Sequence, residues 1–140
     1  MMRTKTVSCS IQRDANDLYE AFWRPEIFPE WASGLSNAAL EKTGDGWKGQ
    51  GPEGPITVTF SAHNDFGVMD HWVDVGGGNI VYIPLRIIPN GAGSEVMLTL
   101  FQYPGMTDEK FETDQDWVKR DLDALKRLLK VRRTVRRPLS

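Results

Sequence analysis

His71 is the most informative polar residue of this 140-residue chain, because the alternation of its strand places it on an apolar face. Closing the hairpins across their turns puts Val58 and Ile83 beside it on the same face, with Met69 two residues before it. A buried imidazole needs a hydrogen-bond partner, and it can hold or move a proton near neutral pH. The position therefore indicates either a core histidine satisfied by a backbone carbonyl or water, or a polar group that faces a ligand.

Partners for His71 can come from a long C-terminal helix, which the spacing of apolar residues predicts over 107–130. Asp114 and Gln115 interrupt its apolar stripe, and either could orient the imidazole for acid–base chemistry. Alternatively, these two residues belong to solvated first turns of the helix. The stripe itself consists of Phe111, Val118, Leu122, Leu125 and Leu129.

The elements before this helix are short and are separated by legible turns. A strand over 4–11 precedes two short helices, the first capped by Asp14 and stopped by Pro25. Tyr19 and Trp31 in this region are further candidate partners for a buried imidazole. The β segments that follow are predicted at 37–42, 47–51, 56–62, 68–75, 79–89 and 94–103.

The apolar residues of these strands share one face, and the long helix has only that face to cover. The sequence therefore predicts an α+β fold in which a curved antiparallel sheet wraps around the C-terminal helix. We expect one domain over residues 1–130 and a basic tail over 131–140. On the opposite face, Asp70 and Arg86 are expected to form an exposed ion pair, and Trp72 could contact a partner or a second subunit.

Composition excludes several classes of protein. The single cysteine, Cys9, cannot form an internal disulfide and fits a reducing compartment, so that cytoplasm is the expected location. No apolar run is long enough to cross a bilayer. The two histidines and one cysteine have no metal-ligand spacing, and phosphate-loop and dinucleotide signatures are absent. We therefore expect neither a metal nor a cofactor.

Charge is distributed unevenly. Residues 126–137 hold seven bases and no acid, whereas the other residues hold 10 bases and 19 acids, a net charge of −9. Basic side chains at a helix C-terminus complement the helix dipole, and a solvated tail is the simplest interpretation. The absence of aromatic residues among these bases disfavours binding of single-stranded nucleic acid.

Several motifs resemble the START/Bet v 1-like superfamily, which includes polyketide cyclase/dehydrase-like and lipid-transport proteins. They are Ile11-x-x-Asp14-x-x-x-Leu18-Tyr19, Pro25-x-x-Phe28-Pro29-x-Trp31, Gly67-Val68-Met69-Asp70-His71, the glycine-rich hairpins and the helix from Trp117 to Leu129. The resemblance covers about residues 4–130 and specifies a fold better than a reaction. It implies a helix-grip fold with a cavity between the sheet and the long helix, and it carries over no universal catalytic residues.

From these observations we expect a small hydrophobic or aromatic molecule to be bound or carried between the sheet and the C-terminal helix. The alternatives are a cofactor-independent cyclase or dehydratase in which His71 and Asp114 are catalytic, and a protein-interaction module that forms a homodimer or binds another protein. The expected ligand-binding residues are Trp31, Phe60, Met69, His71, Ile83, Leu98, Phe111, Gln115 and Val118.

Overall fold

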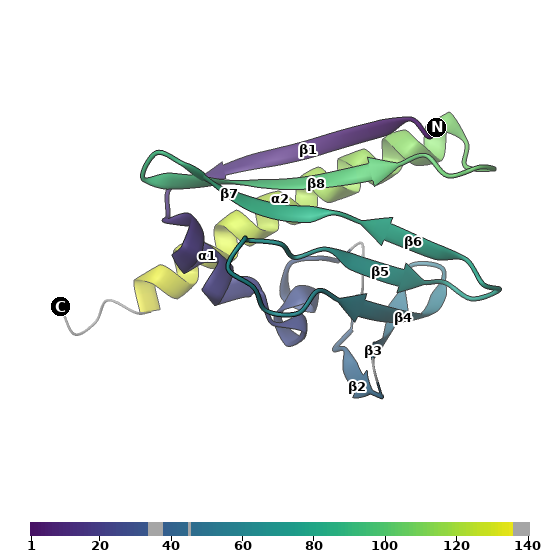
Figure 1. The fold of residues 1–140 in the computed structure, drawn as a ribbon, viewed down its shortest axis with the longest axis horizontal. Coiled ribbons are helices and arrows are strands. Elements are labelled where there is room, and N and C mark those ends of the chain that lie inside the picture. Colours follow the sequence, from purple (N-terminus) through teal and green to yellow (C-terminus); the bar gives the residue numbers. More distant parts are fainter. Residues whose placement is uncertain (34–37, 45, 136–140) are drawn as a thin grey trace.

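The computed structural model describes residues 1–33, 38–44 and 46–135 of the chain. Strands and helices within these residues follow the order that the sequence predicts (Figure 1). In chain order they are β1 (Thr4–Ile11), α1 (Ala15–Phe22), the 3-10 helix η1 (Pro25–Glu30), β2 (Glu41–Thr43), β3 (Gly46–Gly51), β4 (Gly54–Phe60), β5 (His71–Asp74), β6 (Ile80–Ile83), β7 (Leu85–Asn90), β8 (Gly93–Phe101) and α2 (Asp108–Val135).

Antiparallel pairing arranges these strands in two sheets that meet in the middle of the molecule. β1, β8 and β7 form a three-stranded sheet, and β2 to β6 form a five-stranded meander in chain order. The segment before β5 joins the two, since Ile87 N donates to Gly67 O at 2.9 Å and Met69 N to Leu85 O at 2.8 Å. The sheets therefore continue into one curved antiparallel surface.

The division between the sheets lies at Pro84, inside the strand that the sequence predicts over 79–89. Proline has no amide hydrogen and cannot donate to a ladder, so that it interrupts strands. β6 pairs with β5, whereas β7 pairs with β8 and places Leu85 opposite Leu98. One residue thus separates two consecutive strands that belong to different sheets.

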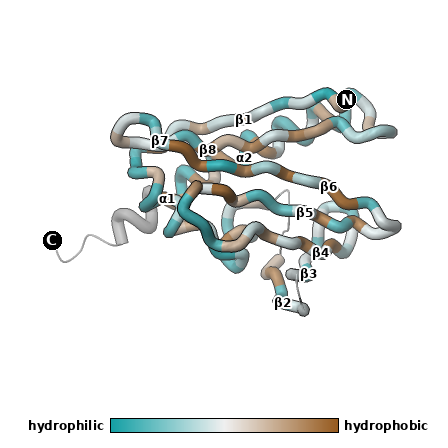
Figure 2. Tube along the Cα trace, in the orientation of Figure 1, coloured by the Kyte–Doolittle hydropathy of each residue, from teal (hydrophilic) through white to brown (hydrophobic). Residues whose placement is uncertain are grey.

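Helices cover the apolar side of this surface. α2 packs against β1 and β8, and α1 packs against β7 and β8; α2 runs behind the three-stranded sheet in Figure 1. Leu122 and Leu125 of α2 are buried together with Leu85 of β7 and Val96 of β8. Hydrophobic stretches are prominent in β6 and β7 (Figure 2). Removing this apolar surface from water is the main stabilising contribution, at about 25 cal/mol per Å².

The two short helical elements form where the sequence places them. The carboxylate of Asp14 accepts a hydrogen bond of 3.1 Å from the backbone N–H of Asp17, which caps α1. α1 buries Phe22 and ends before Pro25, the first residue of η1. η1 then turns Phe28 into the core. These two elements cover the part of the sheet that α2 does not reach.

Two details differ from the sequence prediction. His71 pairs with Ile83 as expected, but Val58 pairs with Val73 rather than with His71. This two-residue shift leaves every side chain on its predicted face, because the strand repeat is two. α2 continues to Val135, so that the predicted start of the tail at residue 131 lies inside the helix; residues 136–140 lie outside the described residues.

Candidate functional site

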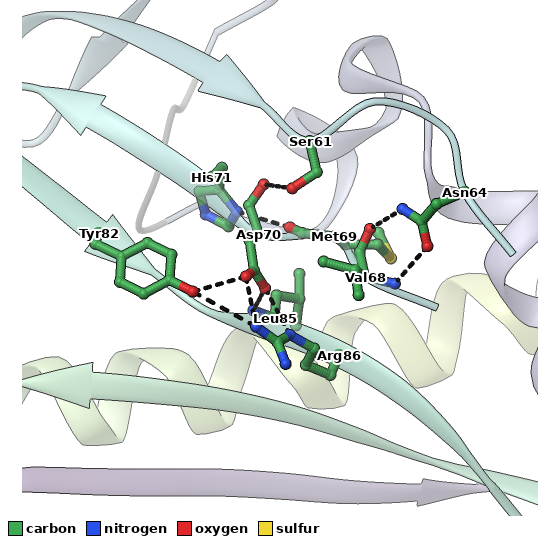
Figure 3. A network of polar contacts seen from close by, with 9 residues as sticks. All are labelled: Ser61, Asn64, Val68, Met69, Asp70, His71, Tyr82, Leu85 and Arg86. Carbon is green, nitrogen blue, oxygen red and sulfur yellow. Dashed lines mark hydrogen bonds and ion pairs between the residues drawn. The ribbon is translucent and has the colours of Figure 1, made fainter. Parts of the chain in front are cut away.

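His71 begins β5, and its side chain is buried on the covered face of the sheet. Its Nδ1 donates a hydrogen bond of 3.1 Å to the carbonyl oxygen of Met69 (Figure 3), so that Nδ1 carries the proton and Nε2 is an acceptor. Burial lowers the pKa of His71 from 6.5 to about 4, and the Met69 hydrogen bond and the Asp70 charge oppose this effect only partly. The imidazole is therefore neutral near pH 7.

Aromatic rings from η1 and β4 pack around this imidazole. The centroids of the Phe28 and Phe60 rings lie 5.4 and 5.6 Å from that of His71, and Trp31 packs against Phe28 at 5.3 Å. We call Phe28, Trp31, Phe60 and His71 the aromatic cluster. The indole Nε1 of Trp31 is buried and has no hydrogen-bond partner among the described residues. Since an unpaired buried donor costs about 1–3 kcal/mol, the cluster holds a donor that an incoming acceptor would satisfy.

A small hollow adjoins the aromatic cluster on the side of α1. In the present conformation it leaves no room for a molecule the size of water. Phe28 and Phe60 belong both to the hollow and to the cluster. The full lining consists of Tyr19, Trp23, Phe28, Phe60, Ser61, Val68 and Met69. Side chains therefore fill the place where the aromatic cluster could receive a ligand.

A larger hollow lies elsewhere, as an open groove of about 530 Å³ beside β2, β3 and β4. Exposed polar side chains, among them Glu41, Lys48 and Thr57, line it together with half-buried Asp74. Gly49 and Ile56, which pair with each other on the covered face, line it as well, so that the lining mixes residues from both faces of the sheet. None of the described lining residues belongs to α2, and the groove is therefore distinct from the cavity between the sheet and the long helix that the sequence leads us to expect.

The structure brings together four of the predicted ligand-binding residues. Trp31, Phe60 and His71 belong to the aromatic cluster, and Met69 accepts the hydrogen bond from His71 and lines the hollow. Ile83 lies opposite His71 in the neighbouring strand. These five residues come from five different parts of the chain, and the pairing of β4, β5 and β6 aligns Phe60, His71 and Ile83.

The remaining predicted residues lie beneath or along α2. Leu98 and Val118 are part of the packed core between β8 and the helix. Phe111 is buried near the start of α2, where the Arg3 guanidinium lies 4.9 Å from its ring centroid. Neither Leu98, Val118 nor Phe111 has a described contact with the polar atoms of the aromatic cluster.

The described contacts do not pair His71 with either of its predicted helix partners. The carboxylate of Asp114 lies 2.6 Å from Nζ of Lys110, one turn earlier in α2. Gln115 is half-buried on the same helix. His71 instead uses the carbonyl of Met69. An acid–base pair between His71 and Asp114 thus has no counterpart in this geometry.

Asp70 points to the other side of the strand from His71 and is the centre of a polar network (Figure 3). Its carboxylate accepts hydrogen bonds from Arg86 at 3.0 and 2.7 Å, from the Tyr82 hydroxyl at 2.7 Å and from Leu85 N at 2.9 Å. Burial by itself raises the pKa of Asp70, but the Arg86 and Tyr82 hydrogen bonds, the Leu85 amide and the Arg86 charge bring it below its ordinary value.

The predicted exposed Asp70–Arg86 pair therefore needs correction. Asp70 is only 4% exposed, whereas about half of the Arg86 side chain reaches solvent. The physical reason is the break at Pro84. The amide of Leu85 donates to the Asp70 carboxylate, while the Met69 carbonyl opposite it accepts from His71. The adjacent side chains of Asp70 and His71 thus hydrogen-bond two backbone groups, the Leu85 amide and the Met69 carbonyl, where the two sheets divide.

Sequence reasoning missed a buried carboxylate on α2. Ser33 Oγ donates to Asp121 Oδ1 at 2.8 Å and accepts from Trp117 Nε1 at 3.0 Å, which ties the helix to the segment after η1. Asp121 is buried. It lies three residues after Val118, on the flank of the apolar stripe, and this spacing is the signal that could have revealed it.

A second missed contact is the pair formed by Glu20 of α1 and His63 of the loop between β4 and β5. Glu20 Oε1 and His63 Nε2 are 2.6 Å apart, and both side chains are partly exposed. A histidine–carboxylate pair thus exists in this protein, but at the surface rather than at His71. No local signal could have found it, because the two residues are 43 positions apart in the chain.

Other kinds of site find little support in the described residues. They contain no group of three or more histidine, cysteine, aspartate or glutamate residues that could hold a metal ion. No helix in the part of the chain that the structure describes has the length and apolar character required to cross a membrane. The polar atoms of the aromatic cluster remain the most distinctive chemical feature of the covered face.

Comparisons with solved structures identify the architecture. XoxI from Bacillus cereus has a TM-score of 0.70 at 16% identity, covering 91% of this chain and 95% of its own. A START superfamily protein from Mycobacterium smegmatis has a TM-score of 0.67 at 11% identity, with 92% and 97% covered. Ara h 8.0201 has a TM-score of 0.66 at 14% identity, with 94% and 99% covered.

This protein therefore has a helix-grip fold like that of these solved structures, which confirms the fold class that the sequence predicts. Similarity at this level of identity concerns the fold alone. No protein-family model matches the chain, and no curated protein has a significantly similar sequence. The function must therefore be argued from the site itself.

Proposed function

We propose that this protein binds a small apolar or aromatic molecule that carries a hydrogen-bond acceptor. The site is the aromatic cluster together with the hollow beside it, between η1, α1 and the strands β4 and β5. The fold supports the proposal in general terms, because its covered sheet face is apolar and includes a few polar atoms. The residues of the cluster make it specific.

The observation that carries the proposal is the buried, unpaired indole N–H of Trp31. Buried donors are almost always hydrogen-bonded, so that an exception calls for an explanation, and the acceptor of a bound ligand would provide one. Phe28 and Phe60 would supply the apolar walls, since both rings contact their neighbours in the cluster. Neutral His71 would add an acceptor, Nε2, so that a carbonyl and a hydroxyl on one ligand would find complementary partners.

Binding requires the site to open. The hollow between Tyr19, Trp23 and the aromatic cluster does not admit a water-sized molecule in the present conformation. A ligand must therefore displace side chains or a loop in order to enter. This requirement favours ligands that replace the lost aromatic contacts with their own rings.

The enzymatic alternative receives less support from the same residues. A general base or acid works best when its pKa lies near the working pH, whereas burial lowers the pKa of His71 to about 4. Asp114, its proposed partner, is paired with Lys110. The neutral imidazole would thus orient a ligand through a hydrogen bond rather than transfer a proton.

Two tryptophan substitutions test the proposal with 8-anilinonaphthalene-1-sulfonate (ANS) as the probe, because ANS combines aromatic rings with sulfonate acceptors. Trp31→Phe keeps an aromatic ring and removes the unpaired donor. We expect its affinity for ANS to fall about 5- to 150-fold, which corresponds to losing one buried hydrogen bond of about 1–3 kcal/mol. Stability should not fall by that amount, because no bond is lost in the free protein.

Trp117→Phe is the matched control, since the Trp117 N–H is already paired with Ser33. It should lower stability by about 1 kcal/mol and leave ANS affinity unchanged. Fluorescence titration gives the affinities, and urea denaturation gives the stabilities. Native mass spectrometry of the purified wild type should also show a co-purifying small molecule. Equal ANS affinity of the wild type and Trp31→Phe would remove the aromatic cluster from the binding site.

A second candidate function, protein–protein contact, rests on the outer face of the sheet. Trp72, Tyr82 and Phe101 stack in a row across β5, β6 and β8, with centroids 5.3 and 6.1 Å apart and interplanar angles of 21° and 24°. Trp72 is 38% exposed and Ile80 is 56% exposed. Because the rings stack on one another, their edges rather than their faces are available to a partner. A nucleobase would need a free ring face to stack on, so this row suits contact with a protein surface better.

The ANS experiment separates the two candidates when Trp72→Thr is added to it. Loss of ANS binding in Trp72→Thr, together with unchanged binding in Trp31→Phe, would place the apolar contact on the outer face. A concentration-dependent mass in sedimentation that disappears in Trp72→Thr would then indicate a homodimer. The proposed ligand site predicts the opposite result for both variants.

A further inference from the structure

The loop between β4 and β5 closes on itself around Asn64. The side-chain amide of Asn64 donates to the carbonyls of Ala62 and Val68, at 2.9 Å in each case. Its Oδ1 accepts from Phe66 N at 2.9 Å and from Val68 N at 3.2 Å. These four bonds hold the turn in one shape, and two of them tie it to Val68, which bridges to Arg86 of β7. We call residues 62–66 the entrance loop.

Both ends of the entrance loop are attached to the sheet. Before it, the amide and the hydroxyl of Ser61 both donate to the carbonyl of Asp70, at 2.9 and 2.8 Å. After it, Gly67 lies so close to β7 that an added Cβ would come within 2.2 Å of the Ile87 carbonyl oxygen. Its φ of +69° also favours glycine. The fixed ends leave residues 62–66 as the segment able to swing.

A latch of contacts holds the entrance loop against α1. Glu20 Oε1 and His63 Nε2 form a hydrogen bond of 2.6 Å, and Asn64 N donates to the Tyr19 hydroxyl at 3.0 Å. The His63 ring packs against Trp23 with a centroid distance of 4.8 Å and against Tyr19 at 5.5 Å. All these contacts join two elements that have no backbone pairing between them.

The same α1 residues form the wall of the hollow beside the aromatic cluster. Tyr19 and Trp23 line it on one side, and Phe28 and Phe60 line it on the other. The loop residue that contacts both Tyr19 and Trp23 is His63. Separating the entrance loop from α1 would therefore release the two side chains that close the hollow.

We propose that the entrance loop is the gate of the ligand site and that the Glu20–His63 pair is its latch. This inference rests on the proposed function, because it concerns access to the same site. About half of each side chain of the pair is exposed, and half-exposed ion pairs are weak. A weak latch over a filled hollow suits a protein that opens to admit a ligand and closes again over it.

Stopped-flow ANS binding tests the latch through Glu20→Ala and His63→Ala. Each variant should raise both the association and the dissociation rate by up to about fivefold, the factor that corresponds to a weak exposed pair, with little change in Kd. The double variant should match His63→Ala, because that substitution already removes the pair with Glu20 together with the ring contacts to Tyr19 and Trp23. Glu26→Ala, an exposed acid on η1 with no described partner, is the matched control and should leave both rates unchanged.

Failure of this inference and failure of the proposed function give different results. Unchanged rates in both latch variants, with an ANS affinity that still depends on Trp31, would overturn the latch alone. If the wild type does not bind ANS, the proposed function fails, and hydrogen exchange then decides whether the loop opens. Faster exchange of the Asn64, Phe66 and Val68 amides in Glu20→Ala would support the gate, and unchanged exchange would overturn it.

Discussion

The two histidines lie in regions that impose opposite conditions on an imidazole. His71 is buried among aromatic rings, donates to a backbone carbonyl and stays neutral down to about pH 4. His63 is partly exposed and contacts a carboxylate, Glu20, across the boundary between a loop and a helix. The pairing that acid–base chemistry would need is thus found at the surface, and the site that could enclose a ligand holds a neutral ring.

This difference shows that a polar residue on an apolar face need not be chemically active. His71 donates its N–H to the carbonyl of Met69, so that this donor is already satisfied without a carboxylate partner. The described polar contact of His63 is with Glu20 of another element, so that it can form and break as the two elements move.

The first prediction concerns the stability that the buried carboxylate of Asp70, next to His71 in the chain, provides. Asp70→Asn removes the charge that Arg86, Tyr82 and Leu85 surround. We expect the unfolding free energy to fall by about 3–4 kcal/mol, at the lower end of the range for buried pairs because Arg86 is half-exposed. Urea denaturation measures the loss.

Asp65→Asn is the control for this substitution, since Asp65 is an acid in the entrance loop with no described ion pair. It should change stability by less than about 0.5 kcal/mol. A loss below about 1 kcal/mol for Asp70→Asn would mean that the network contributes no more than an exposed salt bridge. The polar network would then play no special part in holding the divided sheet together.

The second prediction concerns the pH dependence of stability that the burial of His71 implies. In the unfolded chain His71 takes up a proton near pH 6.5, whereas in the folded protein it does so only near pH 4. Between these values the unfolded state holds more protons, so that stability must fall as pH is lowered from about 6.5 to 4. The 2.5-unit difference corresponds to a loss of about 3 kcal/mol.

Urea denaturation of the wild type and His71→Leu at several pH values between 4 and 7 measures this loss. The substitution should abolish that part of the slope, because leucine does not titrate. Asp70 does not contribute in this window, since its pKa lies below its ordinary value and its stabilisation is lost only at lower pH. Equal slopes in the two proteins would mean that His71 is charged, or solvated, in the folded state.

The third prediction has the smallest effect and concerns the exposed histidine. His63→Ala should change the unfolding free energy by less than about 1 kcal/mol, because its pair with Glu20 is half-exposed. The pH dependence between 4 and 7 that belongs to His71 should be retained. A loss as large as that of Asp70→Asn would show that the entrance loop is part of the structural framework rather than a gate.

Some features of this protein follow from local pattern and could therefore be predicted from the sequence. Alternation along the strands placed Val58, His71 and Ile83 on one face, and helical spacing placed Leu122 and Leu125 against it. The cap at Asp14 was also predictable, because a capping side chain acts within three residues. Periodicity of two or 3.6 residues is a property of the chain itself, and burial of one face follows from it.

Tertiary structure alone decided the polar contacts. The break at Pro84 made Asp70 a buried carboxylate, and strand pairing gave His71 the Met69 carbonyl instead of Asp114. A side-chain partner depends on distances between elements far apart in the chain, which pattern does not encode. For the same reason the unpaired Trp31 N–H and the Glu20–His63 contact became visible only when η1, α1 and the entrance loop were placed together in space.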